Sequence, residues 1–210
     1  MFAARWALPT TADARTPGAG DEPRPLPNSL ARDPSPWIIR FGARLGSGAH
    51  VLDVACGHGR HARHLAGQGC RVTAVDVDAA CGEALRHISG VDFMAFDLEA
   101  GAWPFAPSSF DAVVVVHYLY RPLLPRLAEA LRSDGLLLYE TFAVGNERFG
   151  RPRNPDFLLR PRELLDAFAG LRVLAFEDGI IAGPTPAAIQ RLAAVKLEPD
   201  AIEPVETLVL

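Results

Sequence analysis

The sequence predicts an α/β fold built on a doubly wound, Rossmann-like sheet that is mostly parallel. Apolar runs typical of buried strands alternate with segments of helical periodicity over about a hundred residues, which favours a parallel sheet with right-handed crossovers. Four consecutive valines, at residues 113–116, indicate a central strand buried on both faces. The 210 residues are enough for one domain with a single hydrophobic core.

The expected elements follow one another in a regular order. Residues 33–41 have the pattern of a capped helix start, with Pro36 near the first turn and Trp37 expected in the core. The expected strands cover residues 49–54, 71–76, 92–96, 110–116 and 136–141. Helices are expected between them at residues 58–67, 79–87 and 122–131, the last with its prolines in the first turn.

The pattern changes after residue 141. A long polar loop at residues 143–159 precedes an expected helix at 160–168 and two closing strands at 171–176 and 187–197. Three segments are expected along the chain: a disordered or loosely attached arm at residues 1–32, the folded domain at 33–197 and an acidic tail at 198–210.

Charge and composition exclude several classes of protein. The net charge of −4 and the pI of about 5.9 give no global field that would attract nucleic acid or an anionic membrane. No apolar run approaches the ~20 residues that span a bilayer, and the start lacks a signal-peptide pattern, so a cytoplasmic location is expected. The three cysteines form no disulfide or zinc pattern, and His58, His61 and His64 are expected to be surface side chains rather than metal ligands.

A glycine turn after the first expected strand is the main candidate for a ligand site. Gly57 and Gly59, followed by Ala62, fit the spacing of a dinucleotide fingerprint, which alone is weak support. Three acids stand at or after the ends of successive strands, namely Asp53, Asp76 and Asp97. Because the ribose hydroxyls and the amine of adenosine are all donors, separate carboxylates at these strand ends suit a cationic adenosine better than a pyrophosphate.

With these motifs the chain resembles the class I S-adenosylmethionine-dependent methyltransferases, from about residue 35 to residue 197. Residues 51–59 resemble the first motif, 74–78 the acidic end of the second strand, 96–98 the adenine contact, 110–117 the fourth-strand motif and 131–138 the turn into the fifth strand. Ala55 stands where the first motif often has glycine, and Ser133-Asp134 replace the common Pro-Gly. The layout is most similar to the short tellurite-resistance-like and small-molecule methyltransferases, whose architecture implies an antiparallel C-terminal strand.

The resemblance implies S-adenosylmethionine as cofactor and gives each acid a role. Asp76 would hold the ribose hydroxyls, and Val77 would pack on the adenine. Asp97 would accept from the adenine amine, and the backbone of Leu98 would meet the ring edge. The remaining expected cofactor residues would surround the methionine end: Asp53, Ala55, Gly57, Gly59 and His117.

The expected function is methyl transfer to a small-molecule acceptor by in-line displacement, where alignment and desolvation supply most of the catalysis. His117 or Tyr118 would act as a base or orient the acceptor. Residues 143–159 are expected to form an acceptor-binding lid. Five residues are expected to contact the acceptor: Tyr120, Glu140, Asn146, Phe149 and Arg151.

Several alternatives stay open from the sequence. An arginine cluster would attract an anionic small molecule or an RNA backbone, and it consists of Arg148, Arg151, Arg153, Arg160 and Arg162. An RNA or protein methyltransferase is therefore the first alternative to a small-molecule enzyme. A nicotinamide-dependent oxidoreductase is disfavoured by the extra acids, and a binding module that holds S-adenosylmethionine without catalysis is the non-enzymatic alternative.

Overall fold

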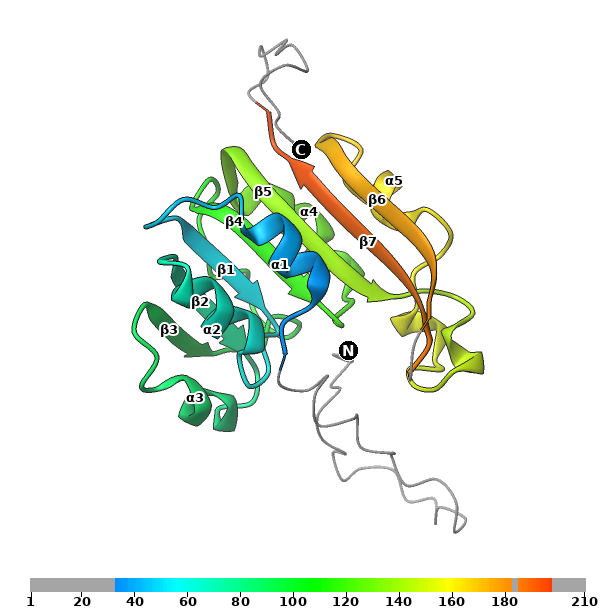
Figure 1. The fold of residues 1–210 in the computed structure, drawn as a ribbon, viewed down its shortest axis with the longest axis horizontal. Helices are drawn as coiled ribbons and strands as arrows, with labels where there is room; N and C mark the ends of the chain where they lie inside the picture. The colour runs from blue at the N-terminus through cyan, green and yellow to red at the C-terminus, as the bar shows by residue number, and fades with distance from the viewer. Residues whose placement is uncertain (1–32, 183–184, 198–210) are drawn as a thin grey trace.

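A seven-stranded sheet with helices on both faces forms the body of the computed structural model, which describes residues 33–182 and 185–197 (Figure 1). The strand order is β3-β2-β1-β4-β5-β7-β6. Strands β1 to β5 pair in parallel, whereas β7 runs antiparallel to both β5 and β6. The prediction of a doubly wound, mostly parallel sheet with an antiparallel strand near the C-terminus is confirmed. The expected arm at 1–32 and tail at 198–210 lie outside the described residues.

The elements observed match those expected in kind and order. The strands are β1 (His50–Val54), β2 (Arg71–Asp76), β3 (Val91–Ala95), β4 (Phe110–Val116), β5 (Leu131–Phe142), β6 (Arg172–Ile181) and β7 (Ala187–Val195). The α-helices are α1 (Pro36–Gly42), α2 (Arg60–Gly67), α3 (Ala80–Leu85), α4 (Leu124–Ala130) and α5 (Glu163–Ala167). Short 3-10 turns are η1 (Arg121–Leu123), η2 (Asn146–Arg148) and η3 (Pro155–Phe157).

Several element boundaries differ from the prediction, among them the end of β6, which lies five residues beyond the expected residue 176, and three of the differences have a clear physical reason. Helix α2 begins two residues later than expected because its N-cap, Gly59, has a left-handed φ of 74°. Helix α5 begins three residues later than expected because Arg162 has a φ of 62°. Strand β5 begins five residues earlier than expected. Leu131 pairs with Phe110 before the register shifts, and Asp134, at a φ of 60°, donates its N–H to the carbonyl of Lys196 at 2.6 Å.

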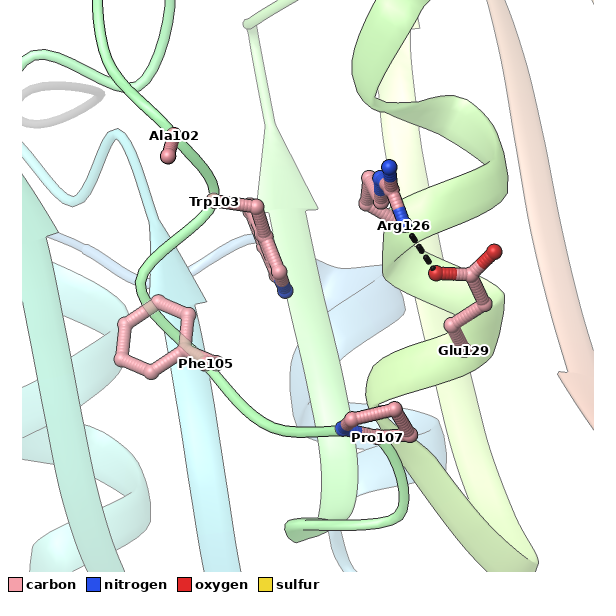
Figure 2. Close-up of a pocket in the computed structure, with 6 residues that line it drawn as sticks. All are labelled: Ala102, Trp103, Phe105, Pro107, Arg126 and Glu129. Carbon is pink, nitrogen blue, oxygen red and sulfur yellow. Dashed lines mark hydrogen bonds and ion pairs between the residues drawn. The ribbon is translucent and has the colours of Figure 1, made fainter.

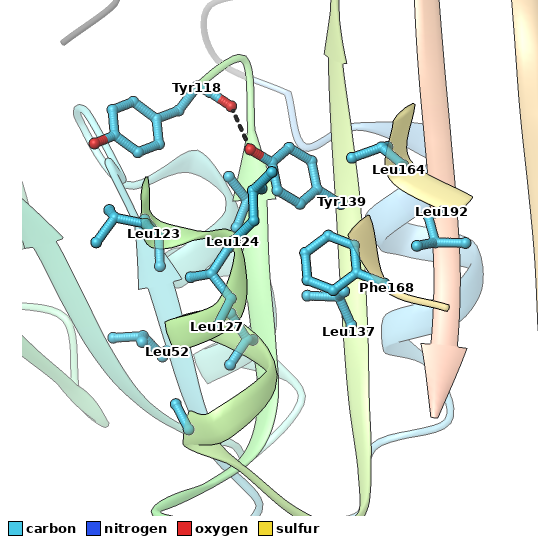
Figure 3. Packing of buried hydrophobic residues seen from close by; sticks show 14 of the residues in the cluster. Leu52, Tyr118, Leu123, Leu124, Leu127, Leu137, Tyr139, Leu164, Phe168 and Leu192 are labelled. Carbon is cyan, nitrogen blue, oxygen red and sulfur yellow. Dashed lines mark hydrogen bonds between the residues drawn. The ribbon is translucent and has the colours of Figure 1, made fainter. Parts of the chain in front are cut away.

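The core has two halves, one on each face of the sheet. Strand residues Val51, Val114 and Leu138 face α1 and α2, where Trp37 and Leu65 are buried. The opposite face packs against α4 and α5, and its larger members are Leu52, Leu127, Leu137, Tyr139, Phe168 and Leu192 (Figure 3). Each such side chain contributes about 1.5–3 kcal/mol by leaving water. The four consecutive valines of β4 are buried from both sides, as expected.

This arrangement aligns the carboxyl ends of β1, β2 and β3. Val54 pairs with Val75, and Asp76 pairs with Ala95, so the chain leaves the three strands at one edge of the sheet. In open α/β sheets, ligands bind at this edge where the strand order reverses, which here lies between β1 and β4. The edge formed by residues that follow β1, β2, β3, β4 and β5 is called the carboxyl edge below.

Candidate functional site

The turn between β1 and α2 places two glycines at the carboxyl edge, and each has a different reason to be glycine. Gly57, at a φ of 54°, faces space in which an added Cβ would meet no described atom within 4 Å. At Gly59, which has a φ of 74°, an added Cβ would lie 2.3 Å from Cδ2 of Leu85 in α3. Gly57 therefore leaves room for a ligand, whereas Gly59 permits α2 and α3 to pack. Ala55 also has a positive φ, of 52°, in the same turn.

Asp53 lies beneath this turn and is 1% exposed. Burial raises the pKa of its carboxyl to about 7, against the opposing effects of the Ala62 N–H and the Arg60 cation. Its Oδ2 atom is buried without a hydrogen-bond partner among the described residues. A buried acceptor of this kind is costly unless a donor reaches it, and an ammonium group supplies both a donor and the charge that stabilises the carboxylate.

Asp76 connects the end of β2 to the glycine turn. Its Oδ2 accepts the N–H of Gly57 at 2.9 Å, and its Oδ1 accepts the N–H of Asp78 at 3.0 Å. Each carboxylate oxygen has two lone pairs, so both can accept a further hydrogen bond. Asp76 therefore fixes the turn and retains the capacity to accept from a pair of vicinal hydroxyls.

The third acid, Asp97, lies exposed just beyond β3. Its Oδ1 accepts the N–H groups of Glu99 and Ala100 at 2.9 and 3.2 Å, which makes it the cap of a local turn. Leu98 is buried, and Val77 is half-buried after β2. The geometry at Asp97 thus includes a structural role in addition to the cofactor role that we expect.

The two expected bases after β4 differ in their surroundings. His117, at a φ of 58°, has its Nδ1 3.4 Å from a guanidinium nitrogen of Arg60. Burial and the cations Arg60 and Arg191 lower its pKa to about 3, so the ring is neutral at pH 7. The hydroxyl of Tyr118 donates to Glu99 at 3.1 Å, and burial together with this carboxylate raises its pKa. Neither group is poised to remove a proton at neutral pH.

Glu140, expected to contact the acceptor, lies in a buried polar network under the start of α1. Its Oε2 accepts the hydroxyl of Ser35 at 2.7 Å and is 2.8 Å from Nε of Arg191, with the geometry of an ion pair rather than an aligned hydrogen bond. Arg191 also contacts Glu177 at 3.1 Å, and Nε2 of His117 is 3.9 Å from the second oxygen of Glu140. Side chains alternate between the two faces along β5, and Glu140 points to the face that α1 covers. Its link to the carboxyl edge is therefore indirect and runs through its neighbour His117.

His61 belongs to the same network, which corrects one expectation. We expected the three histidines of α2 and its preceding turn on the surface, but His61 is 3% exposed. Its Nε2 accepts the N–H of Ser35 at 3.2 Å, so the ring must be neutral, and burial lowers its pKa well below the usual value. The helical moment of α2 explains the difference, because His61 shares the inner face with Leu65.

The segment at residues 143–162 lies beyond the end of β5, on the side of the start of β7 (Figure 1). Asn146 is buried, and its amide donates to the carbonyl of Pro152 at 3.3 Å. Phe149 is exposed, with the guanidinium of Arg148 5.4 Å from its ring centre. Arg151 is also exposed, and Tyr120 is half-buried at the start of η1. Of the five expected acceptor residues, the structure thus places Phe149 and Arg151 on the surface and Glu140 and Asn146 inside.

Two polar residues that the sequence reasoning missed hold this segment in place. Arg121 forms a bidentate pair with Glu163 at 2.6 and 3.0 Å, and it donates to the carbonyls of Asp156 and Leu158. Gln190, fully buried in β7, donates to the carbonyl of Arg160 at 2.6 Å and accepts the N–H of Leu164. Gln190 and its neighbour Arg191 are polar residues within an otherwise apolar strand. This break in the apolar pattern could have indicated that they have buried partners.

A shallow pocket of about 290 Å³ lies away from this edge. Figure 2 shows it between the β3–β4 connection and α4, and it is lined by Ala102, Trp103, Phe105, Pro107, Arg126 and Glu129. Phe105 packs edge-on against Phe110 at the start of β4, with ring centres 5.2 Å apart. The pocket therefore lies toward the amino end of β4 and is separate from the glycine turn. In the described part of the chain, no helix is both long enough and apolar enough to cross a membrane.

Comparison with known sequences agrees with the geometry of the edge. Residues 51–135 match the family model of a methyltransferase domain. Similar proteins include the tRNA U34 carboxymethyltransferase of Aeromonas salmonicida, which is 33% identical over an alignment of 132 positions that covers 53% of this chain and 40% of that protein. The malonyl-[acyl-carrier protein] O-methyltransferase of Enterobacter lignolyticus is 34% identical over an alignment of 102 positions that covers 46% of this chain and 40% of that protein. The chain spans about two fifths of the length of these relatives.

Solved structures show the same fold at low sequence identity. TehB from Haemophilus influenzae superposes with a TM-score of 0.64 at 15% identity, covering 76% of this chain and 61% of that one. A SAM-dependent methyltransferase from Aquifex aeolicus superposes with a TM-score of 0.60 at 17% identity, covering 81% of this chain and 94% of that one.

The matched domain within residues 51–135 is a methyltransferase domain, and the fold is that of the class I S-adenosylmethionine-dependent methyltransferases, as the sequence motifs predicted. The cofactor of this class is S-adenosylmethionine. The edge fits that molecule in two observed respects. Gly57 leaves open space above the turn, and Oδ2 of Asp53 is a buried acceptor that the cofactor's ammonium would satisfy.

Proposed function

We propose that this chain binds S-adenosylmethionine along the ends of β1, β2 and β3 and transfers its methyl group to an acceptor held between His117 and residues 143–162. The observation that carries the proposal is the pairing of an open glycine turn with three acids at successive strand ends. Asp76 would accept from the ribose hydroxyls, Asp97 from the adenine amine and Asp53 from the ammonium. The cofactor supplies an activated methyl group on its sulfonium.

The residues around the acceptor position serve mainly to orient it and to exclude water. His117 is neutral with a lowered pKa, and its Nδ1 faces the cation Arg60, so its remaining N–H is directed to the side of Glu140. A ring in this state can donate a hydrogen bond but is a weak base. We therefore propose an acceptor whose nucleophilic atom is already deprotonated at neutral pH, such as a thiolate, a carboxylate or another anion.

The charge beside the edge favours an anionic small molecule as acceptor. The segment at residues 143–162 has more exposed arginines than acids. Its acids are Glu147 and Asp156, and its exposed arginines are Arg148, Arg151, Arg153, Arg160 and Arg162. Contacts from Arg121 and Gln190 hold the backbone near Arg160 and Arg162, which reduces the entropy lost when these two arginines bind an anion.

RNA is the second candidate acceptor, and a specific observation favours it. Several relatives with about a third of identical residues are named tRNA U34 carboxymethyltransferases, and the same arginines could bind phosphates. Binding of a tRNA to this surface would weaken steeply as salt is added, whereas binding of a small anion would weaken only slightly. Fluorescence anisotropy with labelled tRNA over a salt series separates the two.

Replacement of Asp76 tests the cofactor site directly. Asp76→Ala should lower the affinity for S-adenosylhomocysteine by about 100-fold or more, because two charge-assisted hydrogen bonds are lost. Isothermal titration calorimetry measures this change. Asp92→Ala, which removes an exposed acid of β3, is the matched control and should bind normally. A folded Asp76→Ala protein that binds with unchanged affinity would refute the assignment.

A further inference from the structure

We propose that Phe149 stacks on a planar aromatic ring of the acceptor, while Arg148 binds an anionic group attached to that ring. The two residues belong to the short connection at residues 144–150, which contains η2 and is called the η2 turn below. This inference rests on the proposed function and deepens it, because it narrows the acceptor from any small anion to an aromatic one.

The η2 turn begins at the carboxyl end of β5. Phe142 is the last residue of β5, and its ring centre lies 4.6 Å from that of His117, the residue after β4. Two residues later the chain reaches Gly145, whose φ of 106° turns the backbone into η2. The η2 turn therefore starts beside the place to which we assign the acceptor.

Phe149 is an aromatic side chain that the core does not use. It is 38% exposed, and it belongs to none of the apolar clusters formed by the described residues. At Gly150, an added Cβ would meet no described atom within 4 Å beyond its neighbours in the chain. Val144, at the start of the η2 turn, is also exposed. A flat ring thus has both an apolar surface and room beside it.

Hydrogen bonds within the η2 turn fix its shape. The N–H groups of Phe149 and Gly150 both donate to the carbonyl of Asn146, at 2.8 and 3.1 Å. The side chain of Asn146 is buried and donates to the carbonyl of Pro152 at 3.3 Å. Because the backbone that carries the Phe149 ring is already ordered, less entropy is lost when a ligand binds against the ring.

Arg148 places a positive charge beside this ring. Its guanidinium carbon is 5.4 Å from the centre of the Phe149 ring, and its Nε donates to the carbonyl of Gly145 at 3.2 Å. The adjacent acid, Glu147, accepts the N–H of Gly145 at 2.8 Å. A ligand with an aromatic ring and an anionic group can therefore stack on Phe149 and accept a charge-assisted hydrogen bond from Arg148.

A second pair of arginine and phenylalanine shows what distinguishes the η2 turn. In α1, the guanidinium carbon of Arg40 lies 4.8 Å from the ring centre of Phe41, but Phe41 is only 4% exposed. The core covers that ring, so a ligand could reach the arginine but could not stack on the phenylalanine. Arg40 therefore provides a matched control for Arg148.

Two phosphate esters that differ only in the saturation of a ring test the proposal. Phenyl phosphate and cyclohexyl phosphate have the same charge and nearly the same size, but only the first is planar. In the presence of saturating S-adenosylhomocysteine, the wild-type protein should bind phenyl phosphate about 5-fold more tightly, as expected for one aromatic contact. Titrations followed by the amide NMR signals of the labelled protein give both dissociation constants.

Variants assign this preference to the η2 turn. Phe149→Leu keeps an apolar side chain without the ring, so it should bind the two esters equally. Arg148→Met should weaken both esters about 10-fold and keep the preference, because it removes only the charge-assisted contact. Arg40→Met makes the same change of charge on α1 and should bind both esters as the wild type does. The amide spectra also check that each variant is folded.

Four outcomes would overturn the inference. They are a wild-type protein that does not prefer phenyl phosphate, a Phe149→Leu protein that keeps the preference, an Arg148→Met protein with wild-type affinities, and a single-stranded hexauridylate that binds more than 100-fold more tightly than phenyl phosphate. The first needs no variant, and the last would assign the η2 turn to RNA. Failure of S-adenosylhomocysteine to bind would instead refute the proposed function, so the two failures are distinguishable.

Discussion

At the scale of single residues, the carboxyl edge combines a buried carboxylate that is costly for folding with open space at the glycine turn. Asp53 is buried with one oxygen unsatisfied, and Gly57 leaves a space that no described side chain fills. Gly59, two residues later, is required by packing against Leu85. The same three-residue motif therefore contains one glycine beside open space and one that the packing against Leu85 requires.

Alanine substitution of the two glycines should separate these roles. Gly57→Ala should lower stability by only about 1 kcal/mol, the cost of its left-handed backbone, while it weakens S-adenosylhomocysteine binding by filling the ligand space. Gly59→Ala should lower stability by roughly 3 kcal/mol, because strain and a clash with Leu85 add. Denaturant unfolding and calorimetry on both variants measure the two effects.

A second substitution provides the control for Gly59. If the clash with Leu85 is the cause, Leu85→Ala combined with Gly59→Ala should destabilise the protein less than the sum of the two single changes. Equal effects of Gly57→Ala and Gly59→Ala on binding and on stability would contradict the division of roles.

At the scale of elements, the segment between β5 and α5 is held by side chains from distant parts of the chain. Arg121, at the start of η1, binds Glu163 and two carbonyls of the segment, and Gln190 of β7 binds the backbone on either side of Arg162. A bridge between Ala143 and Leu159 closes the segment at its base. Any lid-like movement would therefore involve the part between these anchors, at about residues 145–153.

Removal of the Arg121 anchor should loosen the segment. Arg121→Met leaves Glu163 and two carbonyls without this partner, so amide hydrogen exchange at residues 154–163 should accelerate about 10-fold. Mass spectrometry of peptic peptides measures the exchange. Arg126→Met, which removes only an exposed pair with Glu129, is the control. If amide exchange at residues 154–163 is equally fast in Arg121→Met and in the control variant, Arg121 is not the anchor.

At the scale of the whole molecule, the network under α1 couples stability to pH. His61 and His117 have lowered pKa values and stay neutral in the folded protein, so stability falls as pH decreases below about 6.5, where the unfolded chain gains the protons. Asp53 has the opposite sign. Its pKa is raised to about 7, so its burial penalty is full above pH 7 and decreases as pH falls toward 3.8. On acidification the two histidines lower the free energy of unfolding, whereas Asp53 raises it. The sum of the three effects is a net loss of stability.

Substitution of His61 should reduce this acid sensitivity. His61→Gln removes one of the two histidines but keeps an acceptor for the N–H of Ser35. The unfolding free energy of the variant should fall less steeply between pH 6 and pH 4.5, by about 1.4 kcal/mol per pH unit. Urea unfolding across this range provides the measurement. His87→Gln, which changes an exposed histidine, is the control and should keep the wild-type dependence of the unfolding free energy on pH. An unchanged pH dependence in His61→Gln would contradict the role of the network.

The sequence by itself determined the layers of the fold and the carboxyl edge to which we assign the cofactor. The valine-rich runs predict strands that are buried on both faces. The glycine turn after the first strand and the acids at successive strand ends can be read from the order of neighbouring residues along the chain. These features gave the parallel sheet, the glycine turn and the positions of Asp53, Asp76 and Asp97, because each is set by residues a few positions apart.

Only the tertiary structure decided what surrounds those residues. Arg60, His117, Glu140 and Arg191 come from four separate elements, and their distances depend on strand register and on the alternation of side chains across the sheet. Sequence spacing suggested that Glu140 faced the acceptor, whereas its pairing in β5 turns it under α1. Buried polar groups are partnered across long sequence separations, so the network that sets the charge of the edge becomes visible only when the strands are assembled.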